Sequence, residues 1–391
     1  MDAIYLDHAA TTPVHPRVLE AMLPYLRDVS GNPSSVHAAG RAARSAVDGA
    51  RDALAAALTC LPRELIFTGS GTEADNLALR GVLERHAAAW GRHIVVTAIE
   101  HEAVLGTAQR LGQAGAAELT VVGCDAQCRV DPEAVAAAVR PDTLLVSAML
   151  VNNELGTVQD VAAIAAAVRR RNPRTLVHTD AAQALGRVPA QPGALDVDLM
   201  TIVGHKVYGP KGVGALWVRD GVFLAAQMTG GGQERERRSG TENVAGIAGL
   251  GAAARLAVER MPSETARQSG LANRLTHLLA ERVPGLIVTG DPAHRAPGFA
   301  TFAIPGARTD VMLVALDSRG VQASGGSACS SGAATPSHVL LAMGFEPGLA
   351  ACALRCTGGL STTEADIDRA AELIGESVDQ VRGAPAIGAA Q

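Results

Sequence analysis

Residues 198–214 have the sequence Asp-Leu-Met-Thr-Ile-Val-Gly-His-Lys-Val-Tyr-Gly-Pro-Lys-Gly-Val-Gly and contain the only two lysines of the 391-residue chain, Lys206 and Lys211. Arginine, which supplies all the other permanent cations, stays charged where a desolvated lysine can lose its proton. A Schiff base to an aldehyde, as in pyridoxal phosphate (PLP) enzymes, needs that neutral amine. Lys206 follows an apolar run at 199–203 that predicts a buried strand, so we expect it at a strand end. On this stretch alone, an ordinary lysine is an equally good interpretation.

The composition limits the classes of protein that fit. Hydrophobic residues make up 48% of the chain, enough for a large core, and the net charge of -5 excludes a general basic surface for nucleic acid. No apolar run is long enough to cross a bilayer, and the N-terminal residues lack a basic region, so a soluble cytoplasmic protein is predicted. The six cysteines do not form a disulfide framework, and their spacing predicts no metal site.

Short apolar runs alternate with helical patterns on both sides of Lys206. The predicted strands are residues 64–68, 93–98, 119–122, 143–149, 175–179, 199–203 and 213–218. Helical spacing of apolar residues lies between several of them, at 76–90, 132–139 and 161–171. This alternation predicts an α/β fold with a mostly parallel, seven-stranded sheet that is covered by helices on both faces.

The C-terminal third has a different pattern. An Ala-rich helical stretch from 245 to about 260 predicts a bridge out of the sheet. Beyond it, predicted strands at 286–288 and 300–304 mix with predicted helices at 309–319 and 364–381, which favours a smaller α/β domain. We therefore predict a large domain over 14–260, a small domain made of 1–13 and 261–382, and a disordered tail at 383–391.

Two further motifs place polar groups at the ends of predicted strands. Thr-Gly-Ser-Gly-Thr at 68–72 opens a helix, so backbone N–H groups and the Thr72 hydroxyl could bind a phosphate; a glycine turn with Thr72 as helix N-cap is the alternative. Asp180 follows the strand 175–179, where an anion could keep a PLP ring nitrogen protonated, and Gln183 could bond the ring oxygen. A lone aspartate there is more often a helix cap, so Asp180 is a candidate only because Lys206 follows.

Several longer segments occur in one order between residue 5 and about residue 370. They are Tyr-Leu-Asp at 5–7 with Ala-Thr-Thr-Pro at 10–13, Gly-Asn-Pro-Ser-Ser-Val-His at 31–37, Glu-His at 100–101, Val-Asn-Asn-Glu-Leu-Gly at 151–156, His-Thr-Asp-Ala-Ala-Gln at 178–183, Gly-His-Lys at 204–206, and Gly-Gly-Gly-Gln-Glu-Arg at 230–235 with Arg-Ser-Gly-Thr-Glu-Asn at 238–243. On these segments the chain resembles the cysteine desulfurases of the NifS and IscS group. The resemblance implies a class V, fold-type I PLP-dependent transferase.

The segment Gly-Gly-Ser-Ala-Cys-Ser-Ser-Gly at 325–332 bears on the activity. Because glycine and serine surround it, Cys329 is expected on a mobile, partly exposed loop, which suits a thiol that must reach a substrate and carry sulfur elsewhere. In an arbitrary protein such a cysteine could be incidental. The resemblance implies that Cys329 is the nucleophile, and the continuation Thr-Pro-Ser-His-Val-Leu at 335–340 is similar to the NifS and IscS subgroup.

The resemblance also implies roles around the cofactor ring. Lys206 would hold PLP and move the Cα proton of the substrate, and His101 would stack on the ring and shuttle protons. Asp180 would pair with the ring nitrogen and Gln183 would bond the ring oxygen. Asn153 would lie beside the ring and the substrate.

The implied ligands of the cofactor phosphate and of the substrate come from more distant segments. Gly71, Thr72 and His205 would bind the phosphate, with Thr241 reaching in from a second subunit. Arg355 would clamp the substrate carboxylate, for which a guanidinium is well shaped.

Three positions depart from the family pattern. The family often has a serine that binds the phosphate two residues before its histidine, where this chain has Val203. Arg-Cys-Thr-Gly-Gly at 355–359 replaces the expected Arg-Phe-Ser-Leu-Gly, which changes the packing behind Arg355. The C-terminal tail lacks the longer segment associated with docking to an iron–sulfur scaffold.

The sequence thus predicts a homodimeric enzyme that converts L-cysteine to L-alanine and leaves a persulfide on Cys329. The expected partner is a sulfur-acceptor protein from iron–sulfur assembly, tRNA thiolation or DNA phosphorothioation, with no direct contact to nucleic acid or membrane. A selenocysteine lyase, an aminotransferase, or an inactive homologue that serves as an interaction partner are the alternatives.

Overall fold

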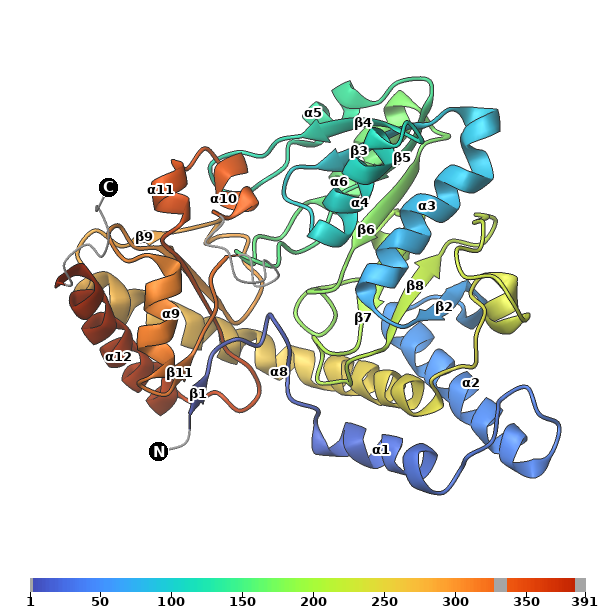
Figure 1. Cartoon of the computed structure of the whole chain (residues 1–391), viewed down its shortest axis with the longest axis horizontal. Helices are drawn as coiled ribbons and strands as arrows, with labels where there is room; N and C mark the ends of the chain where they lie inside the picture. Colours follow the sequence, from blue (N-terminus) through green and yellow to red (C-terminus); the bar gives the residue numbers. More distant parts are fainter. Residues whose placement is uncertain (1–2, 327–335, 384–391) are drawn as a thin grey trace, which may run out of the picture.

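A seven-stranded sheet forms the centre of the computed structural model, which describes residues 3–326 and 336–383 (Figure 1). Its strand order is β2-β8-β7-β6-β5-β3-β4, and only β8 runs antiparallel to its neighbours. The strands are β2 (Leu65–Thr68), β3 (His93–Thr97), β4 (Glu118–Val122), β5 (Thr143–Ser147), β6 (Leu176–Asp180), β7 (Leu199–Val203) and β8 (Gly214–Val218). All except the edge strand β4 are fully buried. The predicted mostly parallel sheet is confirmed.

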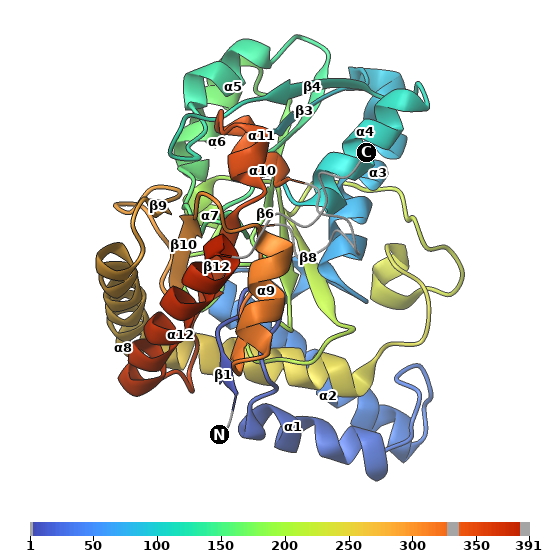
Figure 2. The ribbon, with the colours of Figure 1, turned by 60° about the vertical axis from the view of Figure 1, so that its left-hand side comes forward.

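Helices cover both faces of this sheet (Figure 2). One face packs on α3 (Gly71–Trp90) and α4 (Glu102–Gln113). The other packs on α2 (Ala38–Leu58), α5 (Pro132–Ala138) and α6 (Val161–Arg171). Strand side chains alternate between the two hydrophobic clusters, as Val95 and its neighbours Ile94 and Val96 show. This two-sided burial explains why the strands appeared in the sequence as continuous apolar runs.

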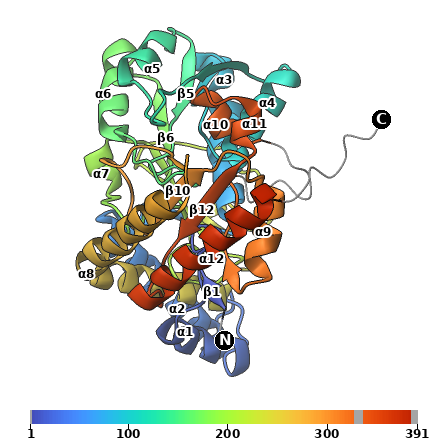
Figure 3. The same ribbon diagram turned by 90° about the vertical axis from the view of Figure 1, so that its left-hand side faces the viewer.

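Helix α8 (Val244–Arg282) is 39 residues long and runs from the sheet to the C-terminal part of the chain (Figures 1 and 3). The helix predicted to end at about residue 260 was therefore too short. Its first half is mostly buried against the sheet's cluster, and Leu271, Leu275 and Leu279 in its second half belong to a separate cluster. The C-terminal elements around that second cluster are β9 (Ile287–Val288), β10 (Phe299–Ala303), β12 (Ala353–Thr357), α9 (Thr309–Asp317) and α12 (Glu364–Gly383), with α10 (His338–Ala342) and α11 (Pro347–Ala350) lying toward the sheet.

The N-terminal segment connects the two parts of the molecule. Strand β1 (Ile4–Tyr5) pairs with β11 (Val321–Gln322), and Leu6 packs in the C-terminal cluster. The chain then crosses to the stretch after β7, where the Thr12 amide donates to the His205 carbonyl at 2.8 Å, before α1 (Pro16–Arg27) begins. These contacts support the division into domains at 14–260 and at 1–13 with 261–382, which we keep as a proposal. No helix among the described residues has both the length and the apolar character needed to span a membrane.

Candidate active site

Lys206 lies just beyond β7, at the edge of the sheet where the sequence predicted it. Its amine donates hydrogen bonds to the carbonyls of Ala9 and Ala10, the second at 2.9 Å. The N-terminal segment therefore holds this amine against the sheet. The charge of Lys206 also lowers the pKa of Asp180, so the two groups interact electrostatically.

Asp180, His101 and Asp75 meet at the same edge. Asp180 is the last residue of β6 and 5% exposed, and one of its oxygens accepts from the Ala182 amide at 2.9 Å. Polar atoms of Asp180, His101 and Asp75 all lie within 4.8 Å of one another. Burial raises the pKa of Asp180, while the charges of His101 and Lys206 lower it. Two buried carboxylates beside an imidazole form an anionic site that suits a cation, either a metal ion or a protonated ring nitrogen.

Asp75 and Glu100 were not assigned roles from the sequence. Burial raises the pKa of Asp75 well above its usual value, and the charge of Asp180 adds to this effect. Glu100 accepts from the Thr97 hydroxyl at 2.6 Å and the Met149 amide at 2.8 Å, and burial raises its pKa to about 7. No local pattern marks either residue, because Asp75 is followed by Asn76 and Glu100 is followed by His101 and Glu102.

Two of the predicted phosphate ligands, Gly71 and Thr72, lie in the first turn of α3. Ser70, rather than Thr72, is the N-cap, because its hydroxyl accepts from the Glu73 amide at 3.1 Å. The alternative interpretation of Thr72 as the cap was therefore wrong: it lies exposed in the first turn. A Cβ at Gly71 would lie 2.4 Å from Val203 Cγ1, so a side chain there would displace Val203. The helix thus presents free N–H groups at Gly71 and Thr72, the arrangement that favours an anion.

His205 follows β7, two residues after Val203, whose Cγ1 lies against Gly71. Its Nδ1 is 3.3 Å from the Thr11 hydroxyl. Burial lowers the pKa of His205 to about 4, and the charges of Lys206 and Lys211 act in the same direction. A neutral imidazole at pH 7 can bond a phosphate but adds no charge. Thr241, the remaining predicted phosphate ligand, is exposed just ahead of α8.

Gln183 faces the same carbonyl as Lys206. Its Nε2 donates to the Ala9 carbonyl at 2.8 Å, and its Oε1 accepts from the guanidinium of Arg187 at 2.6 Å. Gln183 and the lysine amine therefore share one acceptor, and the predicted bond from Gln183 to a ring oxygen stays a prediction. Arg187 was not predicted, although it follows Gln183 by one helical turn in the sequence.

Arg355 is held more tightly than the sequence predicted. It lies on β12, 2% exposed, and donates to the Asn153 carbonyl at 2.7 Å and to an Asp7 carboxylate oxygen at 2.8 Å. Among the described residues, its Nε has no hydrogen-bond partner. Asp7, part of the matched segment 5–7, is the missed partner. It gives the buried guanidinium a counter-charge.

Cys329 lies outside the described residues. The residues on both sides of that gap meet one buried acid, Glu154. The Ser337 hydroxyl donates to Glu154, and a Cβ at Gly326 would lie 2.5 Å from its Oε2. Burial raises the pKa of Glu154. Glu154 thus links both ends of the cysteine-bearing segment to the stretch 151–156.

The family model for Aminotransferase class-V matches residues 4–370. The chain belongs to the class-V aminotransferase family. Among curated class-V relatives, "Cysteine desulfurase IscS" of Anaeromyxobacter dehalogenans is 42% identical over 97% of this chain and 93% of the relative. The relative of the same name from Dictyoglomus turgidum is 39% identical over 97% of this chain and 95% of its own length.

Solved structures agree with this assignment. A "NIFS-LIKE PROTEIN" superimposes with a TM-score of 0.90 at 34% identity, covering 97% of this chain and all of that one. "SspA in complex with cysteine" superimposes with a TM-score of 0.79 at 33% identity, over 90% of this chain and 98% of the other. The predicted resemblance and the predicted fold type are confirmed.

Proposed function

We propose that this chain is a PLP-dependent cysteine desulfurase, which converts L-cysteine to L-alanine and leaves the sulfur as a persulfide on Cys329. The observation that carries the proposal is the meeting of Lys206, Asp180 and His101 at one sheet edge. It is supported by relatives named cysteine desulfurase along almost the whole chain.

The residues present fit PLP. Lys206 supplies the amine for a Schiff base, and the buried Asp180 supplies an anion for the ring nitrogen. The open end of α3 at Gly71 and Thr72, with the neutral His205, suits the phosphate. Gln183 and Asn153 would line the ring, and Thr241 of a second subunit would complete the phosphate site. PLP, when bound, supplies an electron sink for the substrate.

The chain's own residues then perform the reaction. Lys206, once its amine is neutral, takes the proton from the Cα of cysteine, and His101 exchanges protons beside it. The Cys329 thiolate attacks the substrate sulfur, so that an S–S bond forms while the C–S bond breaks. The electron pair of the C–S bond stays with the substrate Cβ, which gains a proton. Lys206 then returns a proton to Cα, and alanine leaves.

Arg355 binds the substrate carboxylate in this proposal. Its Nε is buried and has no hydrogen-bond partner among the described residues, whereas the two other nitrogens donate to Asn153 and Asp7. Charge-assisted bonds from arginine to a carboxylate are strong and directional. Asp7 would then keep the clamp in place rather than compete for the substrate.

The remaining assignments concern the cellular setting. The enzyme is proposed to be a cytoplasmic homodimer that hands the Cys329 sulfur to an acceptor protein. An iron–sulfur scaffold, a tRNA-thiolation protein and a DNA-phosphorothioation protein are the candidate acceptors. The names of the relatives favour the first, since they carry the name IscS.

The test measures alanine formed from L-cysteine, with a reductant present, by the wild type and by Cys329→Ser. We expect alanine from the wild type only, because the variant has no thiol to accept sulfur. Equal activity of the two proteins would contradict the role of Cys329. Glutamate-dependent amino transfer by the wild type would point to an aminotransferase, and activity on selenocysteine alone would point to a selenocysteine lyase.

A further inference from the structure

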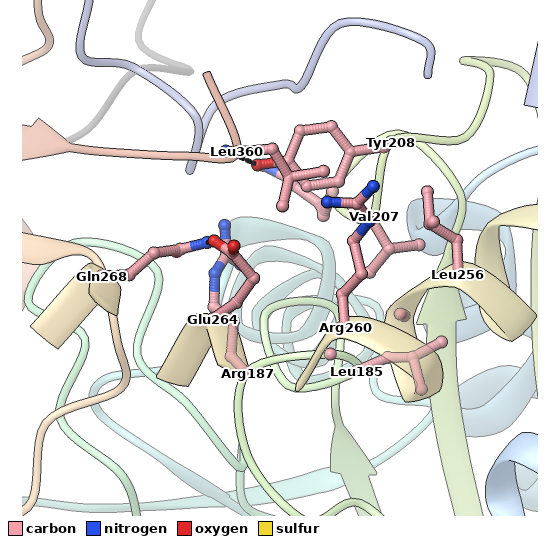
Figure 4. Close-up of a pocket in the computed structure, with 12 residues that line it drawn as sticks. Leu185, Arg187, Val207, Tyr208, Leu256, Arg260, Glu264, Gln268 and Leu360 are labelled. Atoms are coloured by element: carbon pink, nitrogen blue, oxygen red, sulfur yellow. Dashed lines mark hydrogen bonds between the residues drawn. The ribbon is translucent and has the colours of Figure 1, made fainter. Parts of the chain in front are cut away.

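The side chain behind Gln183 is a half-buried cation that forms no ion pair with a carboxylate of the described residues. Arg187 lines a cavity together with Tyr208 and Gln268, as Figure 4 shows, and Lys206 belongs to the same lining. Burial lowers the pKa of Arg187, and the charged groups that act on it are Tyr208 and Arg355. No ion pair joins Arg187 to a carboxylate within the described parts of the chain. A buried guanidinium is costly unless its charge is used.

The contacts of Arg187 fix the orientation of the Gln183 amide. Arginine has only donors, so the Gln183 atom that it contacts at 2.6 Å must be the oxygen. The amide nitrogen therefore points the other way, to the Ala9 carbonyl at 2.8 Å. The same carbonyl accepts from Lys206. Arg187, Gln183, Ala9 and Lys206 thus form one chain of hydrogen bonds.

The guanidinium itself has little freedom to turn away. Its Nη1 also donates to the Gln183 carbonyl at 3.3 Å, and its central carbon lies 5.5 Å from the centre of the Phe299 ring. Contact with an aromatic face stabilises a cation without neutralising it. Arg187 therefore presents its full charge to the Gln183 amide.

We propose that Arg187 is a positioning residue of the cofactor site: it holds the oxygen of Gln183, leaves the amide N–H groups for the Ala9 carbonyl and for the cofactor ring oxygen, and adds a positive charge to the cavity that Lys206 also lines. This inference rests on the proposed PLP chemistry. A cation near the lysine nitrogen disfavours the protonated form of that nitrogen once it is joined to the cofactor. An amide N–H that donates to the ring oxygen acts in the same direction. That oxygen is then a weaker acceptor for the proton on the lysine nitrogen.

Several other titratable or charged groups face this chain of bonds. They are Asp180, Asp75, Glu100 and His101 at the sheet edge, His205 beside Lys206, His8 and Asp7 from the N-terminal segment, Tyr208, Arg355 from β12, and Glu264 from α8. All of them remain when residue 187 alone is changed. A difference between the wild type and an Arg187 variant therefore reports on Arg187.

The test is a pH titration of the absorption of the lysine-bound cofactor in Arg187→Met and in the wild type. We expect the midpoint to rise by about one pH unit in the variant, the size of one charge-assisted hydrogen bond. Arg187→Lys keeps a cationic donor and should titrate close to the wild type. The matched control is Arg295→Met, which removes another half-buried arginine held by a main-chain carbonyl, that of Thr289, and should leave the midpoint unchanged.

Two further variants separate the possible outcomes. Arg187→Gln, which offers an uncharged donor of smaller size, replaces Arg187→Met if that variant does not fold, and should shift the midpoint in the same direction. In a Gln183→Met background the effect of removing Arg187 should shrink, since the amide it orients is gone. Unchanged midpoints in both Arg187→Met and Arg187→Gln would overturn the proposal. The proposed function would instead be overturned if the wild type showed no cofactor absorption and borohydride fixed no cofactor at Lys206.

Discussion

The sheet edge and the strand β12 each place a charged side chain at the candidate site, but they do so by different means. Asp180 ends β6 and Lys206 follows β7, so neighbouring parallel strands bring their backbones to one edge, and only the Lys206 amine uses carbonyls of the N-terminal segment. Arg355 depends on Asp7, which is 348 residues away in the sequence, and on the Asn153 carbonyl. The first arrangement is a property of the sheet, whereas the second exists only when the N-terminal segment has docked.

The largest effect is expected where the comparison is simplest, at Lys206. Lys206→Ala should lower alanine formation by at least about 10²–10⁴-fold, because the amine acts as the base and no arginine can replace it. The variant should still fold, since Lys206 is partly exposed. Borohydride reduction followed by peptide mass spectrometry measures the covalent cofactor.

Lys211→Ala is the matched control, because it removes the only other lysine, which is exposed in the turn after Pro210. It should retain the reducible cofactor and the activity. Cofactor fixed to the Lys206→Ala protein would mean that Lys211 forms the Schiff base.

At the other region, Asp7→Ala tests whether the clamp depends on the docked segment. The Arg355 and Asp7 side chains are 3% and 20% exposed, so loss of the carboxylate leaves a buried cation unpaired. We expect the free energy of unfolding to fall by about 3 kcal/mol and the KM for cysteine to rise. Urea unfolding and steady-state kinetics measure the two effects.

Asp368→Ala provides the comparison for that variant. It removes an ion pair to Arg274 of similar length in the C-terminal part of the molecule, with both side chains nearly half exposed. Water screens such a pair, so its loss should cost far less stability. Equal losses in the two variants would show that burial does not strengthen the Asp7 pair.

The same contrast explains what the sequence could predict. The strands 199–203 and the helix 161–171 were predicted at their observed bounds, and Asp180, Lys206 and Gln183 followed from their places near strand ends. The length of α8 was not predictable from local pattern, because Pro262 interrupts the helical signal while packing at both ends maintains the helix. Asp7 and Arg187 were missed for a related reason: Asp7 acts on Arg355 and Arg187 acts on Gln183, and local sequence does not show such contacts.

Glu100 sharpens the comparison within the sheet edge itself. Its pKa is raised from 4.5 to about 7 by burial, so the folded state binds a proton that the unfolded state releases. Between these two values the native protein holds more protons, and stability therefore falls as pH rises. Glu100→Gln removes that titration. Its stability relative to the wild type should increase between about pH 4.5 and 7, by up to about 3 kcal/mol, and then level off.

Urea unfolding at a series of pH values measures this difference. Glu133→Gln, at a glutamate whose side chain is 71% exposed, should show a much smaller change. If the difference in the free energy of unfolding between Glu100→Gln and the wild type does not change with pH, Glu100 stays ionised in the folded protein.

The smallest effect is expected at Val203, the position at the sheet edge where the family often has a serine. Val203 is 4% exposed and its Cγ1 fills the space beside Gly71. Val203→Ser would place a hydroxyl at the open end of α3, so the apoenzyme should bind PLP about tenfold more tightly, the gain from one charge-assisted hydrogen bond. Val203→Ala, which makes the same space without a donor, is the control in a PLP titration of the apoenzyme. If both variants bind PLP more tightly, the gain comes from the added space. If neither does, His205 and the helix end already satisfy the phosphate.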